Sequence, residues 1–581
     1  MKTKRFLCRV ATMTVAGMLC VQALQPLTAQ AVKFPEEYVN HKKTLKNATL
    51  HVGYMSDEAF KGVFNAFFET DSKTQQLSTP GETNLFKNNA NGKYVKGGFA
   101  DVKFDKNKQT ALITVSPKAR WSDGEPVTSR DVAFNYEMVA NKDSTSPYYT
   151  DDLENIVGMK EYHEGKVDKI SGLEEKDSKH LLIHFRKMTP SIEYIGSGYL
   201  YDSAQPYHYL KDVPFDQMAQ SDKVRKHPLF FGPYKIKKVV EGESIEWVPN
   251  KYYGGPKPKL AKIVMEIVPS VQAVAMMRTQ KYDILMNSSV NVYRRLKKDK
   301  NVVTLGSLGT DITYLGFKMG RTDKNGASVI DKSFPMSNRA LRQAVAYAMN
   351  VRSVIDRFGH GGVKWANTMI SPAYGSYHDK NVKNFDHNMK KANELLDEAG
   401  FKRGKDGYRT LPNGKKLVLR FLASNDGKGG ETVRSNYMQL WKKIGLNVKL
   451  YEGRALDYND FLEDLSSKDD FDLWTDSWNL PPEPTGLPNL AYTARSKFNY
   501  GHFVSKENSE LIASLNSARA YNEKYRIDQM HKWQQYVRKE AYVVPIAYTY
   551  NLETISKRVK GMTISSNDKR YNAWDNVMLT K

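Results

Sequence analysis

Cysteine is almost absent from this chain of 581 residues, which contains only Cys8 and Cys20. Both lie in the first twenty residues, inside a segment that we expect to be removed. A chain that begins after Ala31 therefore has no disulfide bond, no thiol nucleophile and no cysteine metal ligand. Its stability must come from burial, for which about 550 residues are ample, since single cores stop growing near 250–300 residues.

The sequence also lacks the usual signals of catalysis. It has no G-x-S-x-G nucleophile turn, no G-x-x-x-x-G-K-[ST] phosphate loop and no H-E-x-x-H zinc helix. The twelve histidines are scattered, and His180 and His184 lie in a strand-like run where a spacing of four gives no helical metal pair. We therefore expect no enzyme, no cofactor and no metal site.

The first thirty-one residues have the pattern of an export signal. Lys2, Lys4, Arg5 and Arg9 precede a mostly apolar run at 10–24, and Ala-Gln-Ala at 29–31 fits a signal peptidase site. The apolar run is shorter than the roughly 20 residues of a transmembrane helix, although an uncleaved anchor is the alternative. Leu19 stands where a lipoprotein signal needs a small residue, which argues against lipidation at Cys20. We expect export to the extracellular face of the cell envelope.

Basic residues dominate the charge. The chain carries +23, and the leader holds four basic and no acidic residues, which leaves +19 for the mature chain. Such a surface attracts polyanions. Because the leader directs export, anionic wall polymers or acidic glycans are better candidate partners than nucleic acid. The alternative is a solvated basic surface that keeps the protein soluble.

Short strands and capped helices alternate along the chain, which predicts an α/β protein. Strand patterns occur at 49–54, 112–115, 179–186, 263–268, 417–422 and 446–450. Helix patterns occur at 339–356, at 432–444 with Gly445 after it, and at 386–399 with Asp386 as N-cap and Gly400 as stop residue.

Aromatic side chains are abundant, with 34 Tyr, 24 Phe and 8 Trp. Several lie in loop-like segments, including Tyr148-Tyr149, Trp474 with Trp478, and Phe498 with Tyr500. Aromatic side chains in loops can line an adaptable cleft. Ordinary core packing is the other explanation.

Five segments carry a resemblance to a known family. They are ARWSDGEPVT at 119–128 with Asp131-Val132, FGPY at 231–234 with PNKYY at 249–253, residues 338–349, GLNV at 445–448, and residues 471–478. The first is a tight turn followed by a Thr or Ser cap for a helix that starts near Asp131. In this order, the segments resemble family 5, the peptide/nickel class of extracellular solute-binding proteins of ABC transporters.

The resemblance implies a two-lobed clamshell of the type II periplasmic-binding-protein kind, with an extra inserted domain. Lobe I would comprise residues 32–85, 215–309 and 544–581, the inserted domain 86–214, and lobe II 310–543. The lobes would close around an oligopeptide held as an added β-strand. The closed monomer would then dock on an ABC permease whose ATPase subunits power import.

The resemblance also suggests ligand contacts in the loop after Trp478, beginning with Trp478 itself and Asn479. Members that bind a peptide amino terminus place an Asp there, which is missing, so Glu483 is the nearest carboxylate and either replaces it or is a solvated loop residue. Thr475 stands where short-peptide members have an Arg, which favours longer peptides. Cleft-facing positions of the family also match Tyr148, Ser424, Asn425 and Asp426.

The sequence is also compatible with other functions. Within the same family the cargo could be a nickel chelate, haem, a sugar or a pheromone. A different class is a basic surface adhesin that binds anionic wall polymers or glycosaminoglycans, and a third is a hydrolase.

Overall fold

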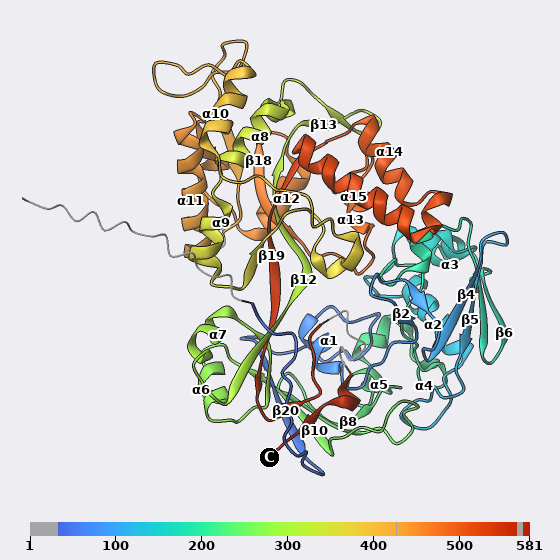
Figure 1. The fold of residues 1–581 in the computed structure, drawn as a ribbon. Helices are drawn as coiled ribbons and strands as arrows, with labels where there is room; N and C mark the ends of the chain where they lie inside the picture. The colour runs from blue at the N-terminus through green and yellow to red at the C-terminus, as the bar shows by residue number, and fades with distance from the viewer. Residues whose placement is uncertain (1–32, 426, 566–572) are drawn as a thin grey trace, which may run out of the picture.

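The computed structural model describes residues 33–425, 427–565 and 573–581. The predicted signal peptide, residues 1–31, lies outside this part of the chain. The described residues form two lobes, one above the other in Figure 1, and a further part that lies at their side. Strands and helices alternate in both lobes, which confirms the α/β class.

One mixed sheet runs through both lobes. Its strands, in spatial order, are β17 (Val448–Leu450), β16 (Leu419–Leu422), β18 (Leu473–Trp478), β12 (Val302–Phe317), β19 (Val543–Ser556), β11 (Ile284–Ser288), β1 (Thr49–Met55), β10 (Lys262–Val268), β9 (Ser244–Pro249) and β8 (Tyr234–Val240), with β15 (Val363–Trp365) beside β19.

Lobe I holds the end of this sheet from β11 to β8. β1 is parallel to both β10 and β11, and the apolar run of β10 buries Ile263 and Met265 completely. The crossover from β10 to β11 passes through α6 (Ala273–Arg278), and α7 (Val290–Leu296) follows β11. The predicted return at 231–253 is the β8–β9 hairpin, in which Tyr234 lies opposite Pro249.

The two longest strands, β12 and β19, connect the lobes (Figure 1). They pair along their length, but the register breaks between Leu308 and Ile312 of β12. Residues 309–311 therefore lie outside the regular ladder, where backbone angles can change with the fewest broken hydrogen bonds. On one side of this break residues 302–308 pair with residues 550–556, and on the other side residues 312–316 pair with residues 543–548.

Lobe II packs helices around β16, β17 and β18. The helices are α8 (Arg339–Ala348), α9 (Val351–Val354), α10 (Met389–Glu398), α11 (Gly427–Lys443), α12 (Tyr458–Ser467), α13 (Gly486–Ala491), α14 (Lys506–Leu515) and α15 (Glu523–Glu540). Gly400 and Gly445 follow α10 and α11 with φ of +84° and +85°, the left-handed stop that the sequence predicted.

Two helix predictions in lobe II need correction. The helix expected at 339–356 ends at Ala348, because the Asn350 side chain accepts a hydrogen bond from Ser353 N–H and caps a new helix, α9. A π-helical turn, η5 (Ile355–Gly359), follows it. The expected N-cap Asp386 is also wrong: Asn388 caps α10 by accepting from Lys391 N–H.

The part beside the lobes includes elements of segment 86–214. Its antiparallel sheet has the order β4 (Ala100–Asp105), β5 (Thr110–Val115), β7 (His180–His184), β6 (Leu173–Asp177). Its main helix, α2 (Ser129–Ala140), has Thr128 as its N-cap, in agreement with the Thr or Ser cap that the sequence predicted. Thr128 also forms a reciprocal capping box with Asp131, so the helix begins two residues before the predicted start near Asp131. Its core also includes Val63, Phe67 and Phe231, so it packs firmly on neighbouring parts of the chain.

The remaining elements are short. They are α1 (Ser72–Ser78), α3 (Met159–His163), α4 (Tyr207–Leu210), α5 (Asp222–Arg225) and the strand pairs β2 (Lys87–Asn88) with β3 (Tyr94–Val95), β13 (Gly320–Thr322) with β14 (Ser328–Ile330), and β20 (Val559–Lys560) with β21 (Met578–Leu579). Among the described residues, no helix has the length and apolarity to cross a bilayer. Over the same ranges, no three His, Cys, Asp or Glu side chains gather as a metal site would require.

Candidate ligand-binding site

The candidate site lies where β16 and β18 end. These strands are parallel neighbours, with Leu422 opposite Trp474. Their carboxyl ends therefore reach the same edge of the sheet, which is where open α/β sheets bind ligands. β18 ends at Trp478, which pairs with Ile312, directly after the register break in β12. The edge thus lies at the boundary between the lobes.

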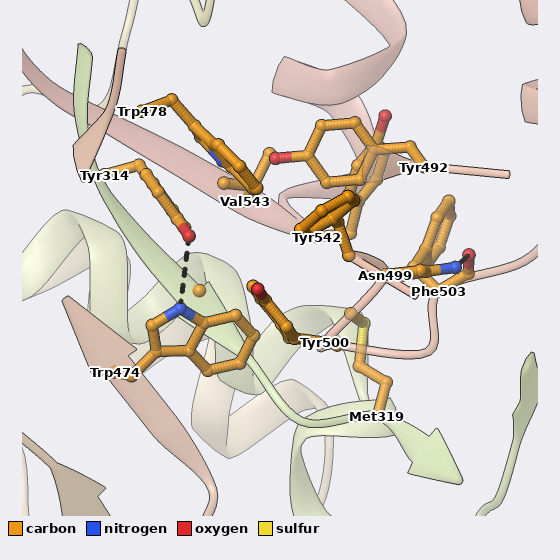
Figure 2. A pocket seen from close by; sticks show the side chains of 13 residues that line it. Tyr314, Met319, Trp474, Trp478, Tyr492, Asn499, Tyr500, Phe503, Tyr542 and Val543 are labelled. Carbon is orange, nitrogen blue, oxygen red and sulfur yellow. Dashed lines mark hydrogen bonds between the residues drawn. The ribbon is translucent and has the colours of Figure 1, made fainter. Parts of the chain in front are cut away.

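Aromatic rings gather at this edge, and we call their cluster the aromatic slot. The ring of Trp478 lies parallel to those of Tyr314 and Tyr500, with centroids 6.2 Å and 6.4 Å apart, and edge-on to Phe498. Trp474 Nε1 donates a hydrogen bond of 3.4 Å to the Tyr314 hydroxyl (Figure 2). Each such ring pair contributes about 0.5–1.5 kcal/mol beyond its buried area.

The aromatic slot is narrow. About 20 Å³ inside it is open to the centre of a water molecule, which is room for about one water. A ligand side chain can enter only if the rings move apart. Burial, and then nearby Asp476, raises the pKa of Tyr314 well above its ordinary value, so its hydroxyl stays neutral and available for hydrogen bonding.

The loop after β18, residues 479–485, is held in place by hydrogen bonds to its backbone carbonyl groups. Leu480 O accepts a 2.7 Å hydrogen bond from the Thr310 hydroxyl, within the register break of β12. Pro481 O accepts another of 2.7 Å from the Tyr374 hydroxyl. We call this segment the 479–485 loop. Its path is fixed from both the strand connection and lobe II.

Glu483 has a role that the sequence did not suggest. It is only 4% exposed, so the expectation of a solvated loop residue is wrong. Its Oε1 accepts from Arg526 Nη2 at 2.7 Å, and its carboxylate also accepts from the Thr485 hydroxyl and N–H. The loop folds back on α15, so the negative charge of Glu483 is compensated by Arg526 inside the protein. A ligand ammonium would have to replace Arg526, and the anchoring role stays a prediction that this geometry does not favour.

The other predicted residues on β18 and its loop point in different directions. Thr475 and Trp478 lie three positions apart on a strand, which places their side chains on opposite faces of the sheet. Thr475 is half-buried opposite Leu315, and Asn479 is exposed just beyond the strand. The structure thus separates Thr475 from the aromatic slot.

Ser424 and Asn425 share the edge with Trp478, because they follow the end of β16 at Leu422 within three residues. Asn425 N–H donates to Leu456 O at 2.7 Å, and Ser424 O accepts from Arg434 Nη1 at 2.9 Å. The predicted Asp426 lies outside the described residues.

Tyr148 is placed apart from these residues, in segment 86–214. It is 44% exposed, and its hydroxyl donates to the carbonyl of Glu69 at 2.7 Å. Its hydrogen bond ties it to the backbone before α1 rather than to the end of β18.

A larger and more polar cavity lies on the same lobe, between α9–η5 and α11. It has about 660 Å³ of space and is lined by Asn350, Arg357, Phe358, Glu431, Asn436 and Gln439 among others. We call it the polar cavity. A π-helical turn of the kind found at functional sites forms one wall. Its size suits several residues of an extended chain.

The family follows from a direct comparison. The model of the bacterial extracellular solute-binding proteins, family 5 Middle, matches residues 95–499 of this chain. The chain belongs to this family. Membership confirms the family predicted from the five motifs, and an extracellular solute-binding role comes with it.

Known relatives of this family 5 protein agree. "Oligopeptide-binding protein OppA" of Lactococcus lactis subsp. lactis is 36% identical over 559 residues, covering 94% of this chain and 92% of the relative. "Oligopeptide-binding protein AppA" of Bacillus subtilis is 23% identical over 488 residues, covering 81% and 80%. Both are named as oligopeptide-binding proteins.

Solved structures confirm the clamshell class of this family 5 protein. Lactococcal OppA, complexed with an endogenous peptide in the closed conformation, matches with a TM-score of 0.72 over 91% of this chain and 99% of that one. The murein tripeptide binding protein MppA, in an unliganded open form, matches with a TM-score of 0.74 at 18% identity, over 93% and 99%. The second likeness shows the fold alone.

Sequence reasoning missed several residues of this family 5 site. Phe498 and Tyr500 stood out only as loop aromatics, and nothing in the spacing predicted that Tyr314, far away on β12, would join them. Arg357 and Arg526 gave no signal, because their roles depend on which helices pack together.

Proposed function

We propose that this protein is the substrate-capturing component of an ABC importer, which binds oligopeptides between its lobes and delivers them to a membrane permease with ATPase subunits. The observation that carries the proposal is the 36% identity to lactococcal OppA along nearly the whole of both chains. The protein acts as a monomer and performs no catalysis.

Two surfaces of lobe II fit an extended peptide. The peptide backbone would lie along the sheet edge at Trp478, where main-chain hydrogen bonds supply affinity and pockets for alternate side chains supply selectivity. The aromatic slot suits one apolar side chain after its rings separate, and the polar cavity suits a longer polar stretch. Asn479, Ser424 and Asn425 would contact the peptide from the same edge.

Peptide length would be loosely defined in this arrangement. Glu483 is engaged by Arg526, and Thr475 offers no positive charge, so neither end of the ligand meets a dedicated ion-pair partner there. Free carboxylate and ammonium groups would stay hydrated or reach residues such as Arg357. Longer peptides with protruding ends are therefore the expected cargo.

The domain division follows the same proposal. Residues 32–85, 215–309 and 544–581 form lobe I, residues 86–214 the inserted domain, and residues 310–543 lobe II. Closure is a hinge motion about the β12–β19 connection, driven by the extra contacts that the ligand makes in the closed state.

Native mass spectrometry of the mature protein, purified directly from cells, tests the proposal. We expect co-purifying peptides of mixed sequence and a broad length distribution after gentle denaturation. An empty protein that also ignores a peptide library would reject it, and one sharp non-peptide mass would identify another cargo.

The basic charge supports a second, compatible role in retention. A mature chain of +19 without a lipid anchor would be held at the cell surface by anionic wall polymers. Such binding weakens steeply between low and physiological salt, whereas capture in a buried cleft barely changes. An acylated N-terminus at Cys20 in the native protein would overturn this retention role.

A further inference from the structure

Arg526, on α15 of lobe II, is a completely buried cation. Its Nη2 donates to Glu483 Oε1 at 2.7 Å, to the Thr485 hydroxyl at 2.7 Å and to the Ser191 hydroxyl at 2.9 Å. Its Nε donates to Leu515 O at 3.0 Å. One guanidinium therefore contacts the 479–485 loop, the helical body of lobe II and segment 86–214 at once.

The remaining face of this guanidinium lies against aromatic rings. Its Cζ is 4.4 Å from the ring centroid of Tyr194 and 5.9 Å from that of Tyr377. The hydroxyl of Tyr377 donates to that of Tyr194 at 2.9 Å. Tyr194 comes from segment 86–214, yet it is part of the lobe II core. Segment 86–214 thus inserts a side chain beneath the 479–485 loop.

Backbone contacts bring the same two parts together around Pro482. A Cβ at Gly196 would lie 2.6 Å from Pro482 Cδ, so only glycine permits this approach. Nearby, Asn91 Nδ2 donates to Glu523 Oε1 at 2.8 Å, and Ser191 Oγ donates to Asn516 Oδ1 at 2.6 Å. The loop is therefore enclosed by segment 86–214 on one side and by α15 on the other.

A buried ion pair is a poor device for stability alone, because the desolvation of both charges offsets their attraction. Apolar side chains of the same volume would stabilise the core as well or better. What an Arg–Glu pair adds is direction, since the N–H groups of a planar guanidinium donate hydrogen bonds only at fixed angles. Here Nη2 donates to Glu483 and Thr485 while Nε donates to Leu515 O, and Nη1 has no hydrogen-bond partner within the described residues. Glu483 and Thr485 lie between Trp478 at the end of β18 and the start of α13, so the guanidinium fixes the loop there against the body of lobe II.

We propose that Arg526 is a positioning residue: it couples the 479–485 loop to segment 86–214, so that the placement of the ligand-facing edge depends on the docking of that segment. The part that concerns ligand affinity rests on the proposed function, whereas the coupling itself does not. Ser191 and Tyr194 are the residues of segment 86–214 that contact Arg526.

The test compares three variants of the mature protein by amide hydrogen exchange, thermal unfolding and binding of a fluorescently labelled nonapeptide library. Arg526→Lys keeps the charge but loses the fork. Ser191→Ala removes two contacts of segment 86–214, those with Arg526 and with Asn516, and leaves the Arg526–Glu483 pair intact. Arg342→Lys is the matched control, because Arg342 is also buried in lobe II but donates only to carbonyls of Met336, Ser337, Glu540 and Ala541.

We expect faster exchange at Leu480, Glu483, Thr485 and Gly486 in ligand-free Arg526→Lys, and a smaller effect of the same kind in Ser191→Ala. Peptide affinity should fall about tenfold in Arg526→Lys, whereas Arg342→Lys should lower the melting temperature without changing affinity or loop exchange. If Arg526→Lys does not fold, Ser191→Ala alone decides.

Equal stability losses in Arg526→Lys and Arg342→Lys, with no change in loop exchange in either, would overturn the proposal. Unchanged exchange at 479–486 in Ser191→Ala would overturn it as well. A wild-type protein that binds no peptide but shows the expected exchange differences would reject the proposed function and uphold the coupling.

Discussion

Two buried carboxyl groups, one in lobe II and one in segment 86–214, are neutralised in different ways. Glu483 is paired with the buried guanidinium of Arg526. Asp202 accepts a hydrogen bond of 2.7 Å from Phe86 N–H, while its Oδ2 has no hydrogen-bond partner within the described chain. Burial raises the pKa of Asp202 to about 8. A cation neutralises the first carboxyl group and a proton neutralises the second.

The two ways of neutralising a buried carboxyl group have different consequences for the two regions. Burial opposes the charge of Arg526, but Glu483 beside it keeps the pKa of Arg526 above its ordinary value, so the guanidinium stays charged at any physiological pH. A pair of fixed charges suits a loop whose position matters for binding. A carboxyl held neutral by a proton needs no partner, but it makes the stability of segment 86–214 depend on pH.

Replacing each carboxyl group by its amide should show the largest difference between Glu483 and Asp202 in the free energy of unfolding. Glu483→Gln leaves the buried charge of Arg526 without a counter-charge, and we expect a loss of about 3–5 kcal/mol in the free energy of unfolding. Asp202→Asn replaces a group that is already neutral at pH 7, so it should cost less than about 1 kcal/mol. Denaturant unfolding at pH 7 measures both, and equal losses would contradict the comparison.

The two regions should also contribute unequally to peptide affinity. Trp478→Ala removes the central ring of the aromatic slot, and we expect peptide affinity to fall by about 2 kcal/mol, or about 30-fold in Kd. Tyr148→Ala in segment 86–214 removes an exposed ring tied to the backbone of Glu69, and should cost about 1 kcal/mol or less. Titration calorimetry with a peptide released from the native protein would show this order. A larger loss in Tyr148→Ala would place the main contact in segment 86–214.

The sequence predicted elements whose causes are local. Thr128 and Asp131 form their capping box from residues three positions apart, and Gly445 ends α11 by its own backbone conformation. The strand patterns at 49–54 and 263–268 became the parallel neighbours β1 and β10. In contrast, the helix expected at 339–356 broke at Asn350, because apolar spacing continues across a residue whose side chain can cap a new helix.

The site was harder to predict because its contacts join distant residues. Trp478 lay in a recognisable motif, but its neighbours Tyr314 and Tyr500 lie on β12 and in a loop, and only the folded sheet brings them together. Glu483 was noticed as the nearest carboxylate to Trp478, yet its partner Arg526 lies 43 positions later on α15. No local pattern distinguishes a loop glutamate that is buried against an arginine from one that faces water.

The pH dependence of stability should separate the two carboxyl groups again. The folded-state pKa of Asp202, about 8, lies above its unfolded value of 3.8, so the folded state binds the proton more tightly. This contribution to stability is fully present below the unfolded pKa and is lost as the pH rises through the folded pKa. We expect wild type to be less stable at pH 9 than at pH 6.

Asp202→Asn isolates the part of this change that comes from Asp202, since Glu69 and Glu553, whose pKa values burial raises to about 7, titrate in both proteins. Between pH 6 and pH 9 the variant should gain stability relative to wild type, by a shift of roughly a few degrees in melting temperature. Glu483→Gln should instead show its loss at both pH values. Parallel pH profiles for wild type and Asp202→Asn would mean that the carboxyl is not protonated in the folded protein.

The smallest expected effect concerns Arg357, which is exposed and unpaired within the described residues, whereas Arg526 is buried and paired. Arg357 is exposed at the polar cavity and has no ion-pair partner within the described residues. An exposed ion pair contributes about 0–1 kcal/mol and is screened by salt. We therefore expect Arg357→Gln to weaken binding of a peptide with a free carboxyl terminus by up to about fivefold at low salt.

The carboxyl-amidated form of the same peptide is the control for Arg357, because it lacks the charge that the guanidinium would attract. Its affinity should not change in Arg357→Gln, and the difference between the two peptides should vanish at high salt. An equal loss for both peptides would mean that Arg357 acts through its apolar stem and packing against Phe358, whose ring lies 5.5 Å from its Cζ. A loss that persists in high salt would mean that the cavity closes around the ligand and buries Arg357, as lobe II already buries Arg526.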